Sequence, residues 1–141
     1  MPNCYIALGS NLGDRLKNIE FALKYLRADP AIEVRRISSF KETEPQDCPP
    51  QQKFLNGVVE LETNYPPEQL LLRLQEIETK LGRKVRRRKN QPRTIDLDIL
   101  IYGRREINQA DLQIPHPRMW QRQFVTEPLR EIAPELFTGE K

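Results

Sequence analysis

The apolar pattern of this 141-residue sequence predicts an α+β fold. Four segments alternate or run apolar as β-strands do, and two segments carry apolar residues at the three- and four-residue spacing of amphipathic helices. Their order is strand, helix, strand, strand, helix, strand. This order is typical of the ferredoxin-like, split βαβ arrangement, an antiparallel sheet with helices packed on one face. The length favours a single domain over residues 1–141.

The first strand is expected over residues 4–9, an apolar, β-prone run that reaches the turn-favouring residues Gly9 and Ser10. A helix follows directly, with Asp14 as its N-cap and Pro30 beyond its end. The stripe of this helix that faces the core is expected to contain Leu16, Ile19, Leu23 and Leu26.

Two more strands are expected over residues 33–42 and 54–62. The segment 44–53 between them is rich in proline and polar residues, which indicates a surface loop long enough to be a lid or binding loop. The second helix should run from Pro66 to the vicinity of Gly82. Its buried stripe is expected to contain Leu70, Leu74, Ile77 and Leu81.

The last strand of the pattern is expected over residues 94–102, where Ile95, Leu97, Ile99 and Ile101 alternate with their neighbours. Beyond it the chain is less regular. Prolines on both sides of His116 predict a loop, and residues 124–132 carry one last short helical pattern.

Charge is concentrated in one part of the chain. The net charge is only +3, but six of the seven residues from Arg83 to Lys89 are basic, which indicates a polyanionic partner. No apolar run approaches the roughly 20 residues of a membrane helix. The first residues lack the features of a signal peptide, so a cytoplasmic protein without a membrane partner is expected.

Asp96 and Asp98 stand two residues apart in an otherwise apolar strand. The two-residue period of a strand places both carboxylates on one face, about 7 Å apart. Carboxylate oxygens are suitable ligands for magnesium, which completes its coordination with water and phosphate oxygens. A strand with one solvent-exposed face would give the same pattern, so the pair alone leaves both interpretations open.

The residues around this pair favour a phosphate site. Arg93 and the basic run come directly before the acidic strand, and guanidinium groups and magnesium together can neutralise phosphate oxygens. His116 could donate to a phosphate, and Phe54, Asn56 and Phe124 could hold a flat heterocycle. Taken singly, a basic run is more often a solvated face or a nucleic-acid patch. A loop histidine is more often incidental, and such aromatic residues more often belong to the core.

Several motifs occur together in a fixed order along nearly the whole chain. They are residues 5–13 (Tyr5 to Gly13), Thr43-Glu44-Pro45, Phe54-Leu55-Asn56, Gln75 with Glu78, residues 92–100 (Pro92 to Leu100), Pro115-His116-Pro117-Arg118, and Arg122, Phe124, Pro128 and Leu129. On these motifs the sequence resembles the 6-hydroxymethyl-7,8-dihydropterin pyrophosphokinase family of folate biosynthesis.

The resemblance implies a reaction in which the pterin hydroxymethyl oxygen attacks the β-phosphorus of ATP and AMP is released. It implies that Asp96 and Asp98 hold two Mg²⁺ ions and that Arg83 and Arg93 complete the catalytic group. The ATP-binding residues that it implies are Gln75, Glu78, Arg83, Arg86, Arg93, Ile99, His116 and Arg122. The pterin-binding residues that it implies are Thr43, Pro45, Phe54, Asn56 and Phe124.

By the same resemblance, residues 44–53 and 84–91 look like the flaps that close over substrates in this family. The sequence departs from the family in the second flap, where Asn90 and Gln91 replace an aromatic residue and glycine. The flap therefore lacks the flat apolar cover that an aromatic side chain gives.

Two other functions compete with this interpretation. A basic ferredoxin-like domain can bind RNA across its sheet, but the aromatic strand motif of such modules is absent, and Asp96 and Asp98 would repel phosphate unless a cation intervened. The other alternative is an inactive relative that binds ATP without turnover. We expect an active monomer that takes ATP and a pterin and binds no nucleic acid.

Overall fold

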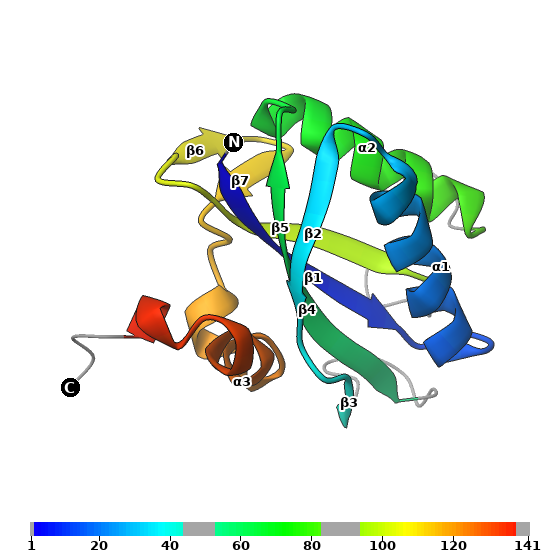
Figure 1. Ribbon diagram of the computed structural model, residues 1–141. Coiled ribbons are helices and arrows are strands. Elements are labelled where there is room, and N and C mark those ends of the chain that lie inside the picture. The colour runs from blue at the N-terminus through cyan, green and yellow to red at the C-terminus, as the bar shows by residue number, and fades with distance from the viewer. Residues whose placement is uncertain (1, 44–52, 83–93, 138–141) are drawn as a thin grey trace.

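The computed structural model describes residues 2–43, 53–82 and 94–137, and its centre is one antiparallel sheet (Figure 1). The strands lie in the order β2-β4-β1-β5, and β3 pairs with the first residues of β4. This order is that of the expected ferredoxin-like fold. The strands are β1 (Asn3–Ser10), β2 (Ile32–Ile37), β3 (Lys41–Thr43), β4 (Phe54–Thr63) and β5 (Asp96–Tyr102).

Two helices, α1 (Arg15–Ala28) and α2 (Pro67–Lys80), cover one face of this sheet (Figure 1). The Asp14 side chain caps α1 by accepting from the Lys17 N–H, as expected. Gly82 follows α2 with a φ of 99°, a left-handed conformation that glycine adopts without strain. None of the helices in the described residues has the length and apolarity needed to cross a membrane.

The core under α1 and α2 contains most of the residues that helical spacing predicts. Ile19, Leu23 and Leu26 of α1 are buried against the sheet. Leu16 is 53% exposed, so its expected inward position is wrong. It lies in the first turn of α1, where the side chain is exposed to solvent and not packed on the sheet. From α2, Leu70, Leu74 and Ile77 are fully buried, and Leu81 packs at the edge.

A third helix, α3 (Gln123–Ile132), lies on the opposite face of the sheet (Figure 1). Together with the 3-10 helices η1 (Met119–Gln121) and η2 (Pro134–Phe137) it buries a second, smaller cluster. This cluster contains Tyr5, Val58, Leu100, Met119, Val125 and Leu129. The second face is therefore only partly covered.

The expected strand over residues 33–42 is two strands, β2 and β3, with a break at residues 38–40. Ser38 still bonds to β4, because its N–H donates to the Val58 carbonyl and its hydroxyl accepts from the Val58 N–H. Phe40 turns its ring over Gly57, where a Cβ atom would lie 2.4 Å from that ring. The break therefore accommodates a core aromatic residue.

The first and last strands of the sheet pattern, β1 and β5, also differ from expectation. β1 continues through Gly9 to Ser10, since both residues pair with β4. In β5, a bulge between Ile99 and Ile101 interrupts the alternation, so that Leu100 and Ile101 both contact the α3 cluster. An unpredicted hairpin, β6 (Ile107–Gln109) and β7 (Leu112–Ile114), follows, and its three-residue strands are too short to give a clear period.

Candidate functional site

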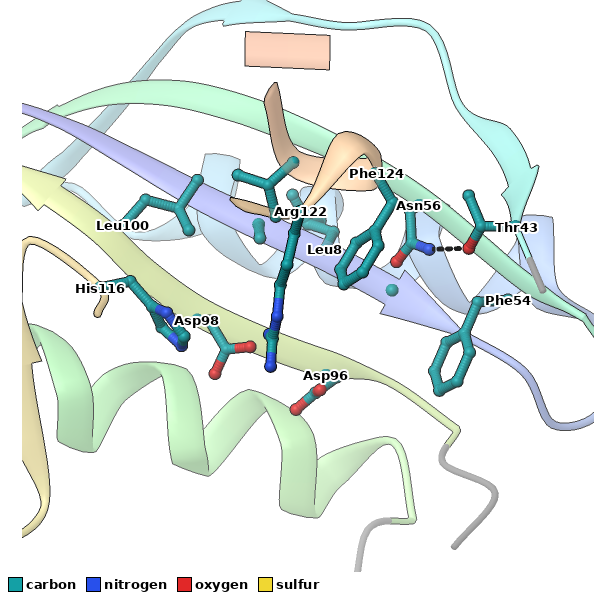
Figure 2. A pocket seen from close by; sticks show the side chains of 13 residues that line it. Leu8, Thr43, Phe54, Asn56, Asp96, Asp98, Leu100, His116, Arg122 and Phe124 are labelled. Atoms are coloured by element: carbon teal, nitrogen blue, oxygen red, sulfur yellow. Dashed lines mark hydrogen bonds between the residues drawn. The ribbon is translucent and has the colours of Figure 1, made fainter. Parts of the chain in front are cut away.

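A cavity of about 170 Å³ opens on the sheet face that α3 leaves uncovered (Figure 2). Five separate segments contribute to it: β1, the end of β3, the start of β4, β5, and the chain from residue 116 to 125. The lining residues are Ala7, Leu8, Gly9, Thr43, Phe54, Asn56, Asp96, Asp98, Leu100, His116, Arg122, Phe124 and Val125.

The strand register arranges the floor of this cavity in rows across the sheet. Gly9 pairs with Asn56 on one side and with Asp96 on the other. In the next row towards α3, Ala7 pairs with Val58 and with Asp98. The two small residues of the central strand therefore separate the β4 side of the floor from the acidic β5 side.

Asp96 and Asp98 lie on the same face of β5, as their spacing predicts. Both are half-buried and both line the cavity, while Leu97 between them points into the core under α1 and α2. In Figure 2 the two carboxylates point into the same space. The bulge of β5 comes only after Ile99, so it leaves the alternation at the aspartates intact.

This pair fits a magnesium site. The described residues contain no group of three or more histidine, cysteine, aspartate and glutamate side chains that could hold a metal. Magnesium needs only one or two carboxylates, because water and substrate phosphates supply its other oxygens. Asp96 and Asp98 therefore offer ligands suited to magnesium bound with a phosphate substrate, and less suited to zinc.

His116 is held beside β5 by its own backbone. Its N–H donates to the Leu100 carbonyl over 2.9 Å, and its Nδ1 accepts from the Arg118 N–H over 3.3 Å. Nδ1 is thus an acceptor, which leaves the proton of the neutral ring on Nε2. The His116 and Asp98 side chains line the same cavity, as Figure 2 shows. It can donate one hydrogen bond into the site.

Burial is the main reason that the pKa of His116 lies below the 6.5 of an unperturbed imidazole, and the positive charge of Arg122 lowers it further. The Asp96 charge opposes this shift, and Arg118 adds to it. The pKa of His116 is thus affected by an acidic side chain, Asp96, and by two basic ones, Arg122 and Arg118. His116 is therefore neutral at physiological pH.

Arg122 supplies the positive charge of the cavity among the described lining residues. It stands at the N-cap position of α3, and its guanidinium lies 5.5 Å from the centre of the Phe124 ring. Figure 2 shows the side chain reaching down towards the space between Asp96 and Asp98. An anion bound there would meet a guanidinium from the α3 side.

The other end of the cavity suits a flat, partly polar molecule. Phe54 and Phe124 come from opposite sides, with the Asn56 side chain between them in Figure 2. The Asn56 Nδ2 donates to the Thr43 hydroxyl, which ties β4 to β3 at this point. The structure thus brings together Thr43, Phe54, Asn56 and Phe124, four of the five residues expected around a pterin.

A second cavity of about 230 Å³ lies on the outer side of β5, against the β6–β7 hairpin. Asp98 and His116 line both cavities. Ile99, expected to bind ATP, lines this second cavity. Its other lining residues are Leu71, Leu97, Ala110, Asp111, Leu112, Gln113 and Pro117.

Gln75 and Glu78, both expected near ATP, line neither cavity. Gln75 is exposed on α2. Glu78 is buried, and its carboxylate accepts from the Leu97 N–H over 2.8 Å. The structure therefore gives Glu78 a position that holds α2 against β5 between the two aspartates.

Four of the expected site residues, Pro45, Arg83, Arg86 and Arg93, lie outside the described residues, as do the two expected flaps apart from Lys53. Ala7 and Gly9 were not expected to line the site, and Gly9 was expected only as a turn residue and as part of the motif at residues 5–13. The signal for them was the pair of small residues at alternate positions of an otherwise bulky strand.

Comparison with known proteins gives one consistent result. A sequence model of the 7,8-dihydro-6-hydroxymethylpterin-pyrophosphokinase family matches residues 5–134. The chain is 45% identical over 132 residues to 2-amino-4-hydroxy-6-hydroxymethyldihydropteridine pyrophosphokinase of Bacillus subtilis, covering 94% of this chain and 78% of that protein. Proteins of the same name from Synechocystis and Methylorubrum extorquens are 45% and 40% identical, over 92% and 99% of this chain and 66% and 87% of their own lengths.

Proposed function

The chain belongs to the 7,8-dihydro-6-hydroxymethylpterin pyrophosphokinase family, and from this premise we propose that it pyrophosphorylates 6-hydroxymethyl-7,8-dihydropterin in folate biosynthesis, with ATP as donor. The pterin hydroxymethyl oxygen attacks the β-phosphorus of ATP. The bond from the β-phosphorus to the oxygen of the α-phosphate breaks, and AMP leaves with that oxygen. The proton of the hydroxymethyl group is lost as the new bond forms.

The observation that carries this proposal is the contact between the two cavities. The larger cavity has aromatic walls and an amide for a heterocyclic acceptor, and the second has apolar residues for a nucleoside. Asp98 and His116 belong to both, so a phosphate chain that enters from the second cavity passes these side chains to reach the acceptor. Catalysis of such a transfer consists largely of positioning and charge stabilisation.

In the acceptor site, Phe54 and Phe124 would stack on the two faces of the pterin ring, and Asn56 would bond to its polar edge. Such contacts hold the ring so that its hydroxymethyl group points towards Asp96 and Asp98. A flat heterocycle held at several points has little freedom, which favours attack in one direction.

Around the phosphates, the Nε2–H of His116 and the guanidinium of Arg122 would donate hydrogen bonds to phosphate oxygens. Asp96 and Asp98 would hold magnesium, which supplies charge neutralisation for the phosphates and helps to activate the attacking hydroxyl. The resemblance adds Arg83, Arg86 and Arg93 as further phosphate ligands. We therefore propose ATP, two Mg²⁺ ions and a pterin as the ligands of this protein. We also propose that it acts as a monomer in the cytoplasm.

The nucleic-acid alternative is not favoured by the family or by the sheet surface. The α3 cluster covers part of the face on which RNA would stack, and the uncovered part carries Asp96 and Asp98. Acidic side chains at the centre of a platform repel phosphate when no cation is bound.

The proposal is tested by mixing the protein with ATP, MgCl₂ and 6-hydroxymethyl-7,8-dihydropterin and measuring AMP. We expect AMP that requires all three components. Retained ATP binding without AMP release would identify an inactive relative, and RNA binding that weakens with salt would support the nucleic-acid alternative.

The variant Asp98→Asn should lower kcat by at least about 100-fold, because the neutral amide is a poorer magnesium ligand of nearly the same size. Its melting temperature should stay close to that of the unsubstituted protein. Glu106→Gln is a matched control, since Glu106 is exposed and outside both cavities. An unchanged kcat in Asp98→Asn would contradict the assigned role.

A further inference from the structure

The side chains of β1 that face the larger cavity become smaller along the strand. Tyr5 is buried under α3, Ala7 is half-buried, and Gly9 has no side chain at all. Ala7 and Gly9 line the cavity. The hollow therefore begins where the central strand stops filling the space above the sheet.

Gly9 lies in this floor, close to the Asn56 side chain. A Cβ atom built on it would lie 2.6 Å from the Oδ1 of Asn56 and 3.6 Å from the Phe54 ring. The first distance is below the 3.0 Å that real Cβ atoms keep from other heavy atoms. Any side chain at position 9 would therefore force Asn56 to move.

The position of Asn56 is defined by two contacts. Its Nδ2 donates to the Thr43 hydroxyl, and its Oδ1 lies over the Cα of Gly9. With the amide oriented in this way, Oδ1 is an acceptor directed over the floor of the cavity. A flat ring bound above the cavity floor would donate a hydrogen bond to Oδ1 from an N–H group on its edge.

We propose that Gly9 is a positioning residue of the acceptor site, because its missing side chain lets the Asn56 amide lie over the central strand and accept a hydrogen bond from the N–H edge of the heterocycle. This inference rests on the proposed function. It assigns to position 9 an effect on the acceptor alone, since Gly9 does not line the second cavity.

The test is a double-mutant cycle with Gly9→Ala, Asn56→Ala and the double variant. Gly9→Ala should raise the KM for 6-hydroxymethyl-7,8-dihydropterin roughly 10- to 100-fold, the equivalent of one lost hydrogen bond to a buried partner. The KM for ATP should stay unchanged. Because the clash is with Asn56, the double variant should have the same pterin KM as Asn56→Ala alone.

Gly103→Ala serves as the control for a strained backbone, since Gly103 has a φ of 52° and lies outside both cavities. It should lower the melting temperature without changing the KM for the pterin. A pterin KM in Gly9→Ala equal to that of the unsubstituted protein would overturn the inference. So would a double variant that binds the pterin much more weakly than Asn56→Ala.

Pterin binding measured by fluorescence without ATP separates this inference from the proposed function. An unsubstituted protein that binds the pterin but releases no AMP would contradict the proposed function and still allow the Gly9 comparison. An unsubstituted protein that binds no pterin would overturn both. If Gly9→Ala does not fold, the double variant should fold, because it lacks the clash, and failure of the double variant would also overturn the inference.

Discussion

The single histidine of the chain reports on the electrostatics of the site. His116 is kept neutral by burial and by the Arg122 charge, while its Nδ1 accepts from the Arg118 N–H and its side chain lines the cavity. A neutral imidazole can donate to a phosphate without the free-energy cost of burying an unpaired charge. The position of the imidazole also depends on β5, because the His116 N–H donates to the Leu100 carbonyl.

We expect an NMR titration of His116 to give a pKa below 6.5, and the only histidine makes the assignment unambiguous. Arg122→Gln should raise that pKa, because it removes a neighbouring positive charge. Lys17→Gln, on α1 and outside both cavities, is the control and should leave it unchanged.

Because folding lowers the pKa of His116, the free energy of unfolding should decrease as the pH falls below neutral. As the pH falls below about 6.5, the unfolded chain takes up a proton at this residue before the folded chain does. His116→Gln should therefore weaken the loss of unfolding free energy between neutral pH and the lowered pKa. An equal loss in both proteins, measured by urea unfolding, would contradict the assigned pKa direction.

At the scale of elements, α2 and β5 are joined by a buried ionisable group. Glu78 is 7% exposed, and its carboxylate accepts from the Leu97 N–H, between the two aspartates. A buried main-chain N–H that loses its acceptor costs free energy. This bond therefore supports the strand that presents the acidic pair.

Glu78→Ala should lower the free energy of unfolding by about 1–3 kcal/mol, because it leaves the Leu97 N–H without this acceptor. Glu78→Gln keeps an oxygen acceptor and should cost less. The exposed Glu76, two residues away on the same helix, gives the control Glu76→Gln. Equal urea-unfolding curves for Glu78→Ala and this control would argue against a structural role for Glu78.

A second link joins α3 to the break between β2 and β3. The Glu131 carboxylate accepts from the Ser39 hydroxyl over 2.7 Å and from the Ser39 N–H. These hydrogen bonds, that of the hydroxyl first, hold the pKa of Glu131 below its usual 4.5. The link positions the segment that leads to Thr43 and so to Asn56.

Because the pKa of Glu131 is lowered on folding, its contribution to stability is present above pH 4.5 and is lost as the pH falls through the lowered value. Glu131→Gln should therefore show a weaker dependence of unfolding free energy on pH in this acidic range. Glu127→Gln, at an exposed position of the same helix, is the control. Identical acid dependence in Glu131→Gln and the unsubstituted protein would contradict the assignment.

In the whole molecule, the sheet has one face buried in the main core and another face on which the larger cavity opens. One face is buried under α1 and α2, and α3 covers only part of the other. The two cavities lie along β5 and meet at Asp98 and His116. If the proposed function holds, each substrate has its own cavity, and Asp98 belongs to both.

Because the two cavities are distinct, ATP and the pterin should each stabilise the folded protein independently. A non-hydrolysable ATP analogue with magnesium at about 100 times its Kd should add roughly 2.7 kcal/mol to the free energy of unfolding. Asp98→Asn should lose most of this effect but keep the stabilisation by the pterin alone, measured by thermal unfolding. Equal loss of both effects would indicate a single shared site.

The single domain over residues 1–141 and the monomeric state stay predictions.

The sequence alone determined the features that depend on local geometry. The two-residue period of a strand placed Asp96 and Asp98 on one face, and helical spacing identified the buried stripe of α2. The order of elements indicated the sheet, because few arrangements bury such a pattern. Motif spacing indicated the family, which the comparisons confirmed.

Features that depend on contacts between distant segments become visible in the folded chain alone. The row Asn56, Gly9 and Asp96 comes from strand register, and the hydrogen-bonded pairs that set it join residues more than 40 positions apart. The side of the sheet on which α3 packs, the bulge of β5 and the exposure of Leu16 are settled by how the elements compete for the same apolar surface. Local periodicity contains no information about that competition, which is why the cavity floor emerges only from the folded chain.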